Sequence, residues 1–256
     1  MTTSERRSLR LAAIGDLHYG RTPASLLQPL FAAIARDADI LALCGDLTDT
    51  GHPDEARSLA RELSIGVKIP IVAVLGNHDY ESGRTAEVTQ ILGEAGISVL
   101  DGTACEIQGI GFAGTKGFAG GFGRRALGPW GEPAIKMFVR EALDEALKLE
   151  TALARLAGAS RRIALLHYAP ICETVQGEPL EIYPYLGSSR LEEPLGRYPV
   201  DAVFHGHAHH GTPEGRTKTG VPVYNVSMGL LHRCRPDQQP FRVIELPRTS
   251  SADGGQ

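Results

Sequence analysis

Residues 9–18, Leu-Arg-Leu-Ala-Ala-Ile-Gly-Asp-Leu-His, form a short apolar run that ends in a glycine, a carboxylate and an imidazole. The run from Leu9 to Ile14 is too short for a helix, and its nearly continuous apolar character is typical of a strand covered on both faces. Asp16 and His18 are two positions apart, so on extended backbone their side chains point the same way. The stretch predicts a buried strand that presents two donor side chains at its carboxyl end.

The same arrangement recurs along the chain. Further apolar runs that end in glycine or polar residues lie at Ile40 to Cys44, Ile69 to Leu75, Arg162 to Leu166 and Ala202 to Phe204. Stretches with helical spacing of apolar residues separate the early runs, at Ser25 to Arg36, Pro53 to Leu63 and Thr85 to Ala95. This alternation of strand and helix predicts a layered α/β domain with parallel connections.

The second half of the chain departs from this alternation. An amphipathic helix is expected from Pro133 to Leu156, with proline at its first position. Val221 to Val226 and Phe241 to Leu246 have the character of strands with no helix between them, which predicts a mixed sheet with antiparallel edges. Because no repeat or linker divides the chain, we expect one domain over residues 1–256, with flexible tails at about 1–8 and 248–256.

The composition excludes several classes of protein. Of the 256 residues, 42% are hydrophobic and 22% are charged, which excludes collagen-like, coiled-coil and disordered chains. A formal net charge of -4 gives no general attraction for nucleic acid or an anionic membrane, and no apolar run approaches the length of a membrane span. The four cysteines are far apart in the sequence, so we expect reduced thiols and a cytoplasmic location.

Clusters of donor side chains follow the predicted strands, and ligands bind beyond the carboxyl ends of strands in open α/β sheets. The clusters are Asp-Leu-His at 16–18, Gly-Asp-Leu-Thr-Asp at 45–49, Gly-Asn-His-Asp at 76–79, a lone histidine at 167 and Gly-His-Ala-His at 206–209. They supply seven oxygen and nitrogen donors: Asp16, His18, Asp46, Asn77, His167, His207 and His209. Seven donors without sulfur exceed one tetrahedral zinc site and suit two ions of Mn, Fe, Zn or Co that share a carboxylate.

This ordered series of motifs, over residues 16–209, resembles that of the calcineurin-like metallophosphoesterase superfamily. The resemblance implies a four-layer αββα sandwich of two mixed β-sheets flanked by helices, with a dinuclear metal site at the strand ends. One metal ion would then be held by Asp16, His18, Asp46 and His209. The other would be held by Asp46, Asn77, His167 and His207, with Asp46 as the bridging carboxylate.

The resemblance also implies two catalytic residues that are not metal ligands. His78 corresponds to the histidine that protonates the leaving oxygen or stabilises the transition state in this family, and Asp79 is expected to orient its imidazole. Asp49 is expected to contact one of the ligand histidines. The other histidines, His52, His205, His210 and His232, are interpreted as surface or hydrogen-bonding residues.

The implied activity is hydrolysis of P–O ester bonds in a small substrate, by attack of a hydroxide that bridges the two ions. The motifs at 45–49 and 76–79 resemble those of bacterial cyclic-nucleotide phosphodiesterases, so we favour phosphodiesters, including cyclic nucleotides, over phosphomonoesters. A nuclease of the same superfamily is disfavoured by the acidic balance. A non-catalytic metal-binding scaffold is a further alternative, disfavoured because a suitable donor residue stands at every ligand position.

Segments 114–132 and 174–196 either line the substrate pocket or are surface loops.

Overall fold

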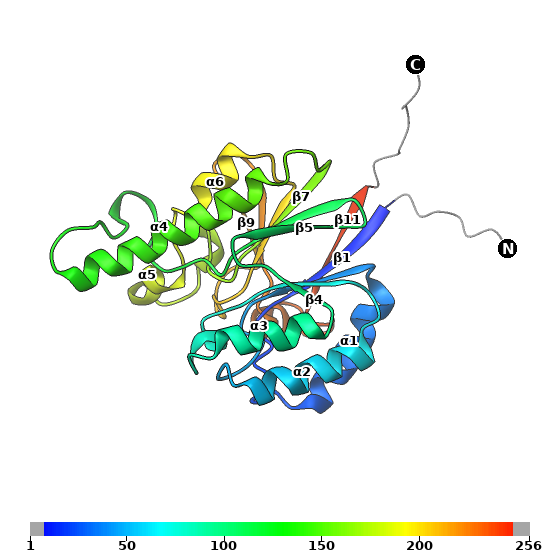
Figure 1. Ribbon diagram of the computed structural model, residues 1–256. Coiled ribbons are helices and arrows are strands. Elements are labelled where there is room, and N and C mark those ends of the chain that lie inside the picture. The colour runs from blue at the N-terminus through cyan, green and yellow to red at the C-terminus, as the bar shows by residue number, and fades with distance from the viewer. Residues whose placement is uncertain (1–7, 248–256) are drawn as a thin grey trace, which may run out of the picture.

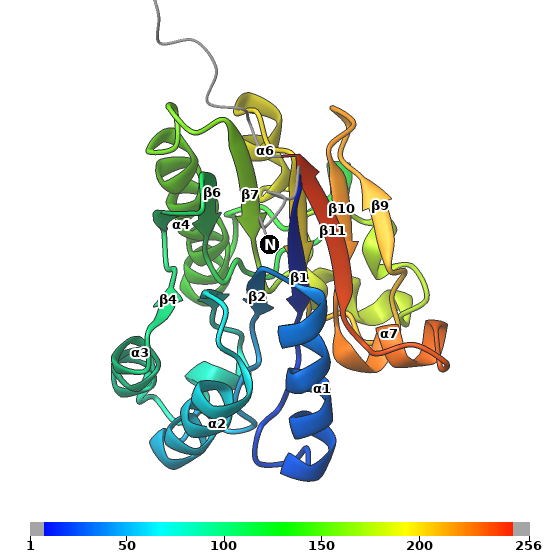
Figure 2. The same cartoon turned by 90° about the vertical axis from the view of Figure 1, so that its right-hand side faces the viewer.

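The predicted first strand is β1 (Ser8–Ile14) in the computed structural model, which describes residues 8–247. Apart from Ser8, which opens this strand, the expected tails at 1–8 and 248–256 lie outside the described residues. The strand belongs to a sheet with the order β11-β1-β2-β3-β4. The other strands are β2 (Ile40–Cys44), β3 (Ile71–Val74), β4 (Ile97–Val99) and β11 (Arg242–Pro247). Only β11 runs antiparallel to its neighbour, and Figure 2 shows it beside β1.

The second sheet has the order β5-β6-β7-β8-β10-β9. Its strands are β5 (Thr103–Ile107), β6 (Ile110–Gly114), β7 (Arg161–Leu165), β8 (Ala202–His205), β9 (Glu214–Arg216) and β10 (Pro222–Asn225). The four inner strands are parallel, and the edge strands β5 and β9 pair antiparallel. Both sheets are therefore mixed as predicted, with one antiparallel edge in the first sheet and two in the second.

Helices cover the two outer faces of the pair of sheets (Figure 1). On the side of the first sheet lie α1 (Ala24–Asp37), α2 (Pro53–Gly66) and α3 (Thr85–Glu94). On the side of the second lie α4 (Pro133–Ala154) and α6 (Glu192–Arg197), and two further short helices are α5 (Tyr183–Leu186) and α7 (Met228–Cys234). Among the described residues, no helix combines the length and apolar character needed to cross a membrane.

The buried side chains confirm the four layers. Because side chains alternate along a strand, Ala12 and Ile14 of β1 pack among the helices α1 to α3, whereas Leu11 and Ala13 pack against the second sheet. The far face of the second sheet, which includes Ala164 of β7, forms a third cluster with α4 and α6. Apolar burial on both faces explains why these strands read as continuous apolar runs in the sequence.

Candidate metal centre

The motifs with donor side chains meet where the two sheets join. The strands that precede them are parallel within each sheet, so their carboxyl ends lie at the same edge. The backbone N–H of Gly15 donates to the carbonyl of Val226 at 2.9 Å, which ties the end of β1 to the chain after β10. The backbone N–H of His207 lies 3.1 Å from both carboxylate oxygens of Asp16. Residues from opposite ends of the sequence thus face each other across the junction.

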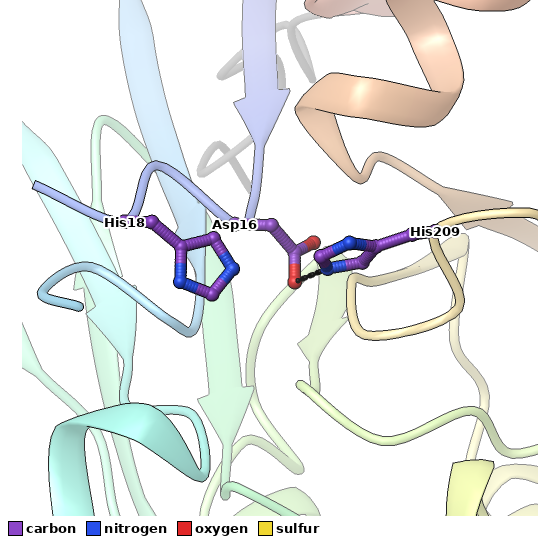
Figure 3. Close-up of side chains that lie close together, drawn as sticks. All are labelled: Asp16, His18 and His209. Atoms are coloured by element: carbon purple, nitrogen blue, oxygen red, sulfur yellow. Dashed lines mark hydrogen bonds and ion pairs between the residues drawn. The ribbon is translucent and has the colours of Figure 1, made fainter. Parts of the chain in front are cut away.

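Asp16, His18 and His209 form the first group of donors, with one donor atom from each within 4.8 Å of the others. Figure 3 shows the Asp16 carboxylate between the two imidazoles, and its Oδ1 lies 3.0 Å from Nε2 of His209. Nδ1 of His18 lies 3.2 Å from a carboxylate oxygen of Asp49, the contact expected for Asp49. Nε2 of His18 is buried and has no hydrogen-bond partner among the described residues. A metal ion would supply the partner that this buried nitrogen lacks.

Asp46, His167 and His207 form a second group within the same limit of 4.8 Å. Nε2 of His167 lies 3.3 Å from Oδ1 of Asp46 and 2.9 Å from Oδ1 of Asn77. The rings of His167 and His207 have centroids 4.9 Å apart. These residues follow β2, β3, β7 and β8, so both sheets contribute to the group.

The Asp46 carboxylate lies between the two groups. Its Oδ2 is 3.8 Å from Nε2 of His18, and its Oδ1 faces His167. Oδ1 also accepts a hydrogen bond of 2.9 Å from the backbone N–H of His78. A carboxylate with one oxygen toward each group has the geometry needed to bridge two cations.

Backbone carbonyls fix the tautomers of three of the histidines. Nδ1 of His167 lies 3.0 Å from the carbonyl oxygen of Cys44, and Nδ1 of His78 lies 2.7 Å from that of Asp49. Nε2 of His207 lies 3.1 Å from the carbonyl oxygen of Tyr185. Because a carbonyl only accepts, each of these nitrogens carries a proton, so in the neutral imidazole the lone pair is on the other ring nitrogen.

Several of the candidate ligands have strained backbone conformations. Asp16, His18, Asp46 and His207 have φ angles of 59°, 43°, 49° and 68°, in the left-handed region that favours glycine. Among the described residues other than glycine, only Gln108 shares this property. Strain of this kind is typical of functional sites, where the surrounding structure holds residues in place.

Glycine is required at two motif positions because other atoms approach closely. A Cβ at Gly76 would lie 2.2 Å from Oδ1 of Asp46, and a Cβ at Gly206 would lie 2.5 Å from Oδ2 of Asp16. Neither glycine has a positive φ, so these positions do not use the conformational freedom of glycine. They leave room for the carboxylates instead.

Electrostatic interactions across the junction shift the pKa values of the group around Asp46. Burial alone would lower the pKa of His167, but the charge of Asp46 and the hydrogen bond with it raise this pKa to about 9. Burial would raise the pKa of Asp46, but His167 and the His78 backbone hold it below its usual value. Burial, together with the charge of His167, lowers the pKa of His207 to about 3. His207 is therefore uncharged at neutral pH, and its unprotonated ring nitrogen is available as a metal ligand.

The Asp79 carboxylate makes no hydrogen bond or ion pair with the imidazole of His78 in this structure. This buried carboxylate accepts hydrogen bonds from the backbone of Leu47 at 3.1 Å, from the backbone of Gly76 at 2.8 Å, and from the backbone and hydroxyl of Thr48 at 2.8 and 2.6 Å. Asp79 thus joins the loop of Asp46 to the loop of Asn77. This corrects the expectation that Asp79 orients His78, whose imidazole is held by the Asp49 carbonyl.

A model of the calcineurin-like phosphoesterase family matches residues 9–211. The chain belongs to this family. The resemblance of the motifs predicted two mixed sheets flanked by helices, and the structure described here confirms this fold. No curated protein sequence matches the chain significantly.

Solved structures share the fold of this calcineurin-like phosphoesterase. The phosphopantetheinyl hydrolase PptH from Mycobacterium tuberculosis has a TM-score of 0.67 at 17% identity, over 97% of this chain and 99% of that chain. The protein TT1561 of Thermus thermophilus has a TM-score of 0.58 at 16% identity, over 94% and 99% of the two chains. The purple acid phosphatase PPD1 from yellow lupin has a TM-score of 0.54 at 15% identity, over 87% of this chain and 44% of that chain.

Proposed function

We propose that this calcineurin-like phosphoesterase hydrolyses phosphodiesters, including cyclic nucleotides, with two transition-metal ions. The ligands would be Asp16, His18, Asp46 and His209 for one ion and Asp46, Asn77, His167 and His207 for the other. The observation that carries the proposal is the position of Asp46, whose carboxylate oxygens face His18 on one side and His167 on the other.

The donor set fits transition metals. It contains carboxylate, amide and imidazole groups, a combination that suits Mn, Fe or Zn. The unpartnered Nε2 of His18 and the neutral state of His207 leave nitrogen lone pairs available. When bound, such ions activate water and stabilise negative charge on a phosphoryl group.

His78 is the residue that we propose as the proton donor to the leaving oxygen. Its Nδ1–H is held by the Asp49 carbonyl, which leaves Nε2 as the nitrogen that exchanges a proton. The ring packs edge-on against that of His18 with centroids 4.6 Å apart, and the side chain is 32% exposed, so substrate can reach it beside the candidate ligands. Asp79 acts in this proposal by holding the two loops together, without touching substrate.

The preference for phosphodiesters over phosphomonoesters rests on the resemblance of the motifs at 45–49 and 76–79. The net charge of -4 supports a small substrate rather than a nucleic acid. PptH is called a phosphopantetheinyl hydrolase and the lupin protein a purple acid phosphatase, and we carry neither substrate over to this chain. The cytoplasmic location inferred from cysteine usage stays a prediction.

Hydrolysis of bis-p-nitrophenyl phosphate and p-nitrophenyl phosphate with added Mn²⁺ tests the proposal. The wild type, Asp46→Asn and the control Asp144→Asn are compared; Asp144 pairs with Arg140 on the surface of α4. We expect Mn²⁺-dependent hydrolysis that favours the diester, is lost in Asp46→Asn and is kept in Asp144→Asn. A clear preference for the monoester would contradict the proposed substrate class. Inactivity of the wild type on both substrates with Mn²⁺, Fe²⁺ and Zn²⁺ would favour the scaffold.

A further inference from the structure

Asn225, at the carboxyl end of β10, is fully buried beneath the loop that carries His207 and His209. Its side-chain nitrogen donates a hydrogen bond of 2.8 Å to the carbonyl of Ala208 and one of 3.3 Å to the carbonyl of Thr174. Its side-chain oxygen accepts a hydrogen bond of 3.1 Å from the backbone N–H of Ser227. Both N–H groups and the oxygen of this amide are therefore in use, which fixes its orientation.

The partners of Asn225 adjoin the candidate ligands of the first metal position. Ala208 lies between His207 and His209, so its hydrogen bond holds the loop from which both imidazoles project. Ser227 bridges to Gly15, the residue before Asp16, and the next backbone N–H, that of Met228, donates to the Gly15 carbonyl at 3.0 Å. One side chain thus connects the backbone beside Asp16 with the backbone beside His209.

Three further contacts hold the same loop. His205, which lies opposite Asn225 in the register of β8 and β10, contacts the Thr174 hydroxyl and the Gly206 carbonyl, each at 2.8 Å. The backbone N–H of His210 donates to the buried carboxylate of Glu178 at 2.6 Å. Thr174 is therefore shared by both residues: its carbonyl accepts a hydrogen bond from Asn225, and its hydroxyl contacts His205.

We propose that Asn225 is a positioning residue, which sets the separation of Asp16 and His209 and thereby the affinity of the first metal position. The inference rests on the proposed function, because it takes these two residues as ligands of one ion. Residues that orient metal ligands commonly change metal affinity by about 10- to 100-fold when they are replaced. Asparagine suits this position because it offers donors to two carbonyls and an acceptor to an N–H at the same time.

Asn225→Asp is the sharpest test of this role. Aspartate has almost the same shape and keeps the acceptor for Ser227, but it places an oxygen against the carbonyls of Ala208 and Thr174. Asn225→Ser removes the same donors without adding charge and serves as the second variant if the aspartate variant does not fold. Leu149→Ala, in the core beneath α4, is the control for loss of stability alone.

Calorimetric titration of the metal-free full chain with Mn²⁺ provides the readout, beside thermal unfolding. For the Asn225 variants we expect at least one of the two Mn²⁺ positions to weaken by about 10- to 100-fold, with activity restored at high Mn²⁺. Leu149→Ala should unfold at a lower temperature but keep both affinities. Unchanged Mn²⁺ affinities in a folded Asn225 variant would overturn this inference but not the proposed function. An equal loss of Mn²⁺ affinity in Leu149→Ala would do the same. A wild type without Mn²⁺ binding would overturn the proposed function and this inference with it.

Discussion

Oδ1 of Asp46 lies 3.3 Å from Nε2 of His167, although Asp46 follows a strand of the first sheet and His167 follows a strand of the second. The candidate metal centre is thus built across the junction of the sheets. In the protein without metal, this contact is an ion pair, because the pKa of His167 is raised to about 9 and that of Asp46 is lowered. A metal ion at this position must displace the proton of His167.

Metal binding should therefore release protons at neutral pH. With a pKa of about 9, His167 carries a proton below that pH in the metal-free protein, and the bound form requires it neutral. We expect Mn²⁺ affinity to rise with pH up to about 9 and then to level off, because the proton is no longer present to compete. Calorimetric titrations at about pH 7 in buffers of different ionisation enthalpy measure the protons released. No buffer dependence at neutral pH would contradict the ion pair.

Replacement of His78 by alanine should reduce the rate and keep the metals. The imidazole is held by the Asp49 carbonyl and contributes only its free nitrogen to the reaction, so kcat should fall by about 10²- to 10⁴-fold, the usual effect of losing a general acid. Bound metal, measured by elemental analysis after dialysis, should stay at the wild-type level. Loss of metal as complete as in Asp46→Asn would show instead that His78 is a ligand.

Asp79→Asn should destabilise the protein more than it changes the chemistry of His78. The carboxylate accepts four hydrogen bonds from Leu47, Thr48 and Gly76, and an amide in its place turns an N–H group toward some of these donors. We expect a loss of roughly 2–4 kcal/mol in the free energy of unfolding, measured with urea. The residual activity should keep the wild-type pH profile. Normal stability with a shifted pH profile would restore the role in which Asp79 orients His78.

Gly76→Ala should disrupt the centre without a change of charge. The added methyl group would lie 2.2 Å from Oδ1 of Asp46 and 2.8 Å from Cε1 of His167, so Asp46 must move away from His167. We expect metal content and activity to be lost together. Gly93→Ala, in α3, is the matched control, because nothing lies within 4 Å of the added carbon. A Gly76 variant with wild-type metal content would contradict the close packing seen here.

His205 should make the stability of the protein sensitive to mildly acidic pH. Burial lowers its folded-state pKa to about 4, from an ordinary value of 6.5. Below pH 6.5 the unfolded chain therefore takes up a proton that the folded protein does not, and stability falls as pH drops toward 4. His205→Gln should remove roughly 3 kcal/mol of this pH dependence. Urea unfolding at about pH 7 and about pH 4.5 measures the change in the free energy of unfolding between these pH values, with the exposed His232→Gln as control. An equal change in the wild type and in His205→Gln would refute the prediction.

Much of the fold could be predicted because buried strands leave a strong signal. The run from Ile40 to Cys44 is β2 from end to end, and its five residues are all buried. By contrast, the hairpin of β5 and β6 was not predicted, since β6 contains Gly111 and Gly114. A Cβ at Gly114 would lie 2.7 Å from Val74 of the other sheet, so glycine is required there by packing that the sequence does not display.

The donor side chains of the site could be proposed from the sequence because each follows a predicted strand. Residues that act through the backbone left no such signal: the carbonyls of Cys44 and Tyr185 could belong to any residue type. The direction of Asp79 depends on the path of two loops, which the local sequence does not determine. Asn225 and His205 lie at strand ends, but Thr174, a partner of both, is far from them in the sequence and becomes a neighbour only in the folded chain.

Anomalous diffraction from crystals grown with Mn²⁺ tests most directly whether these residues form a dinuclear centre around Asp46. We predict two Mn²⁺ peaks about 3.5–4 Å apart, both in contact with the Asp46 carboxylate. One peak should lie beside His18 and His209, and the other beside His167 and His207. A single peak, or two peaks that do not share Asp46, would contradict the dinuclear centre proposed for this calcineurin-like phosphoesterase.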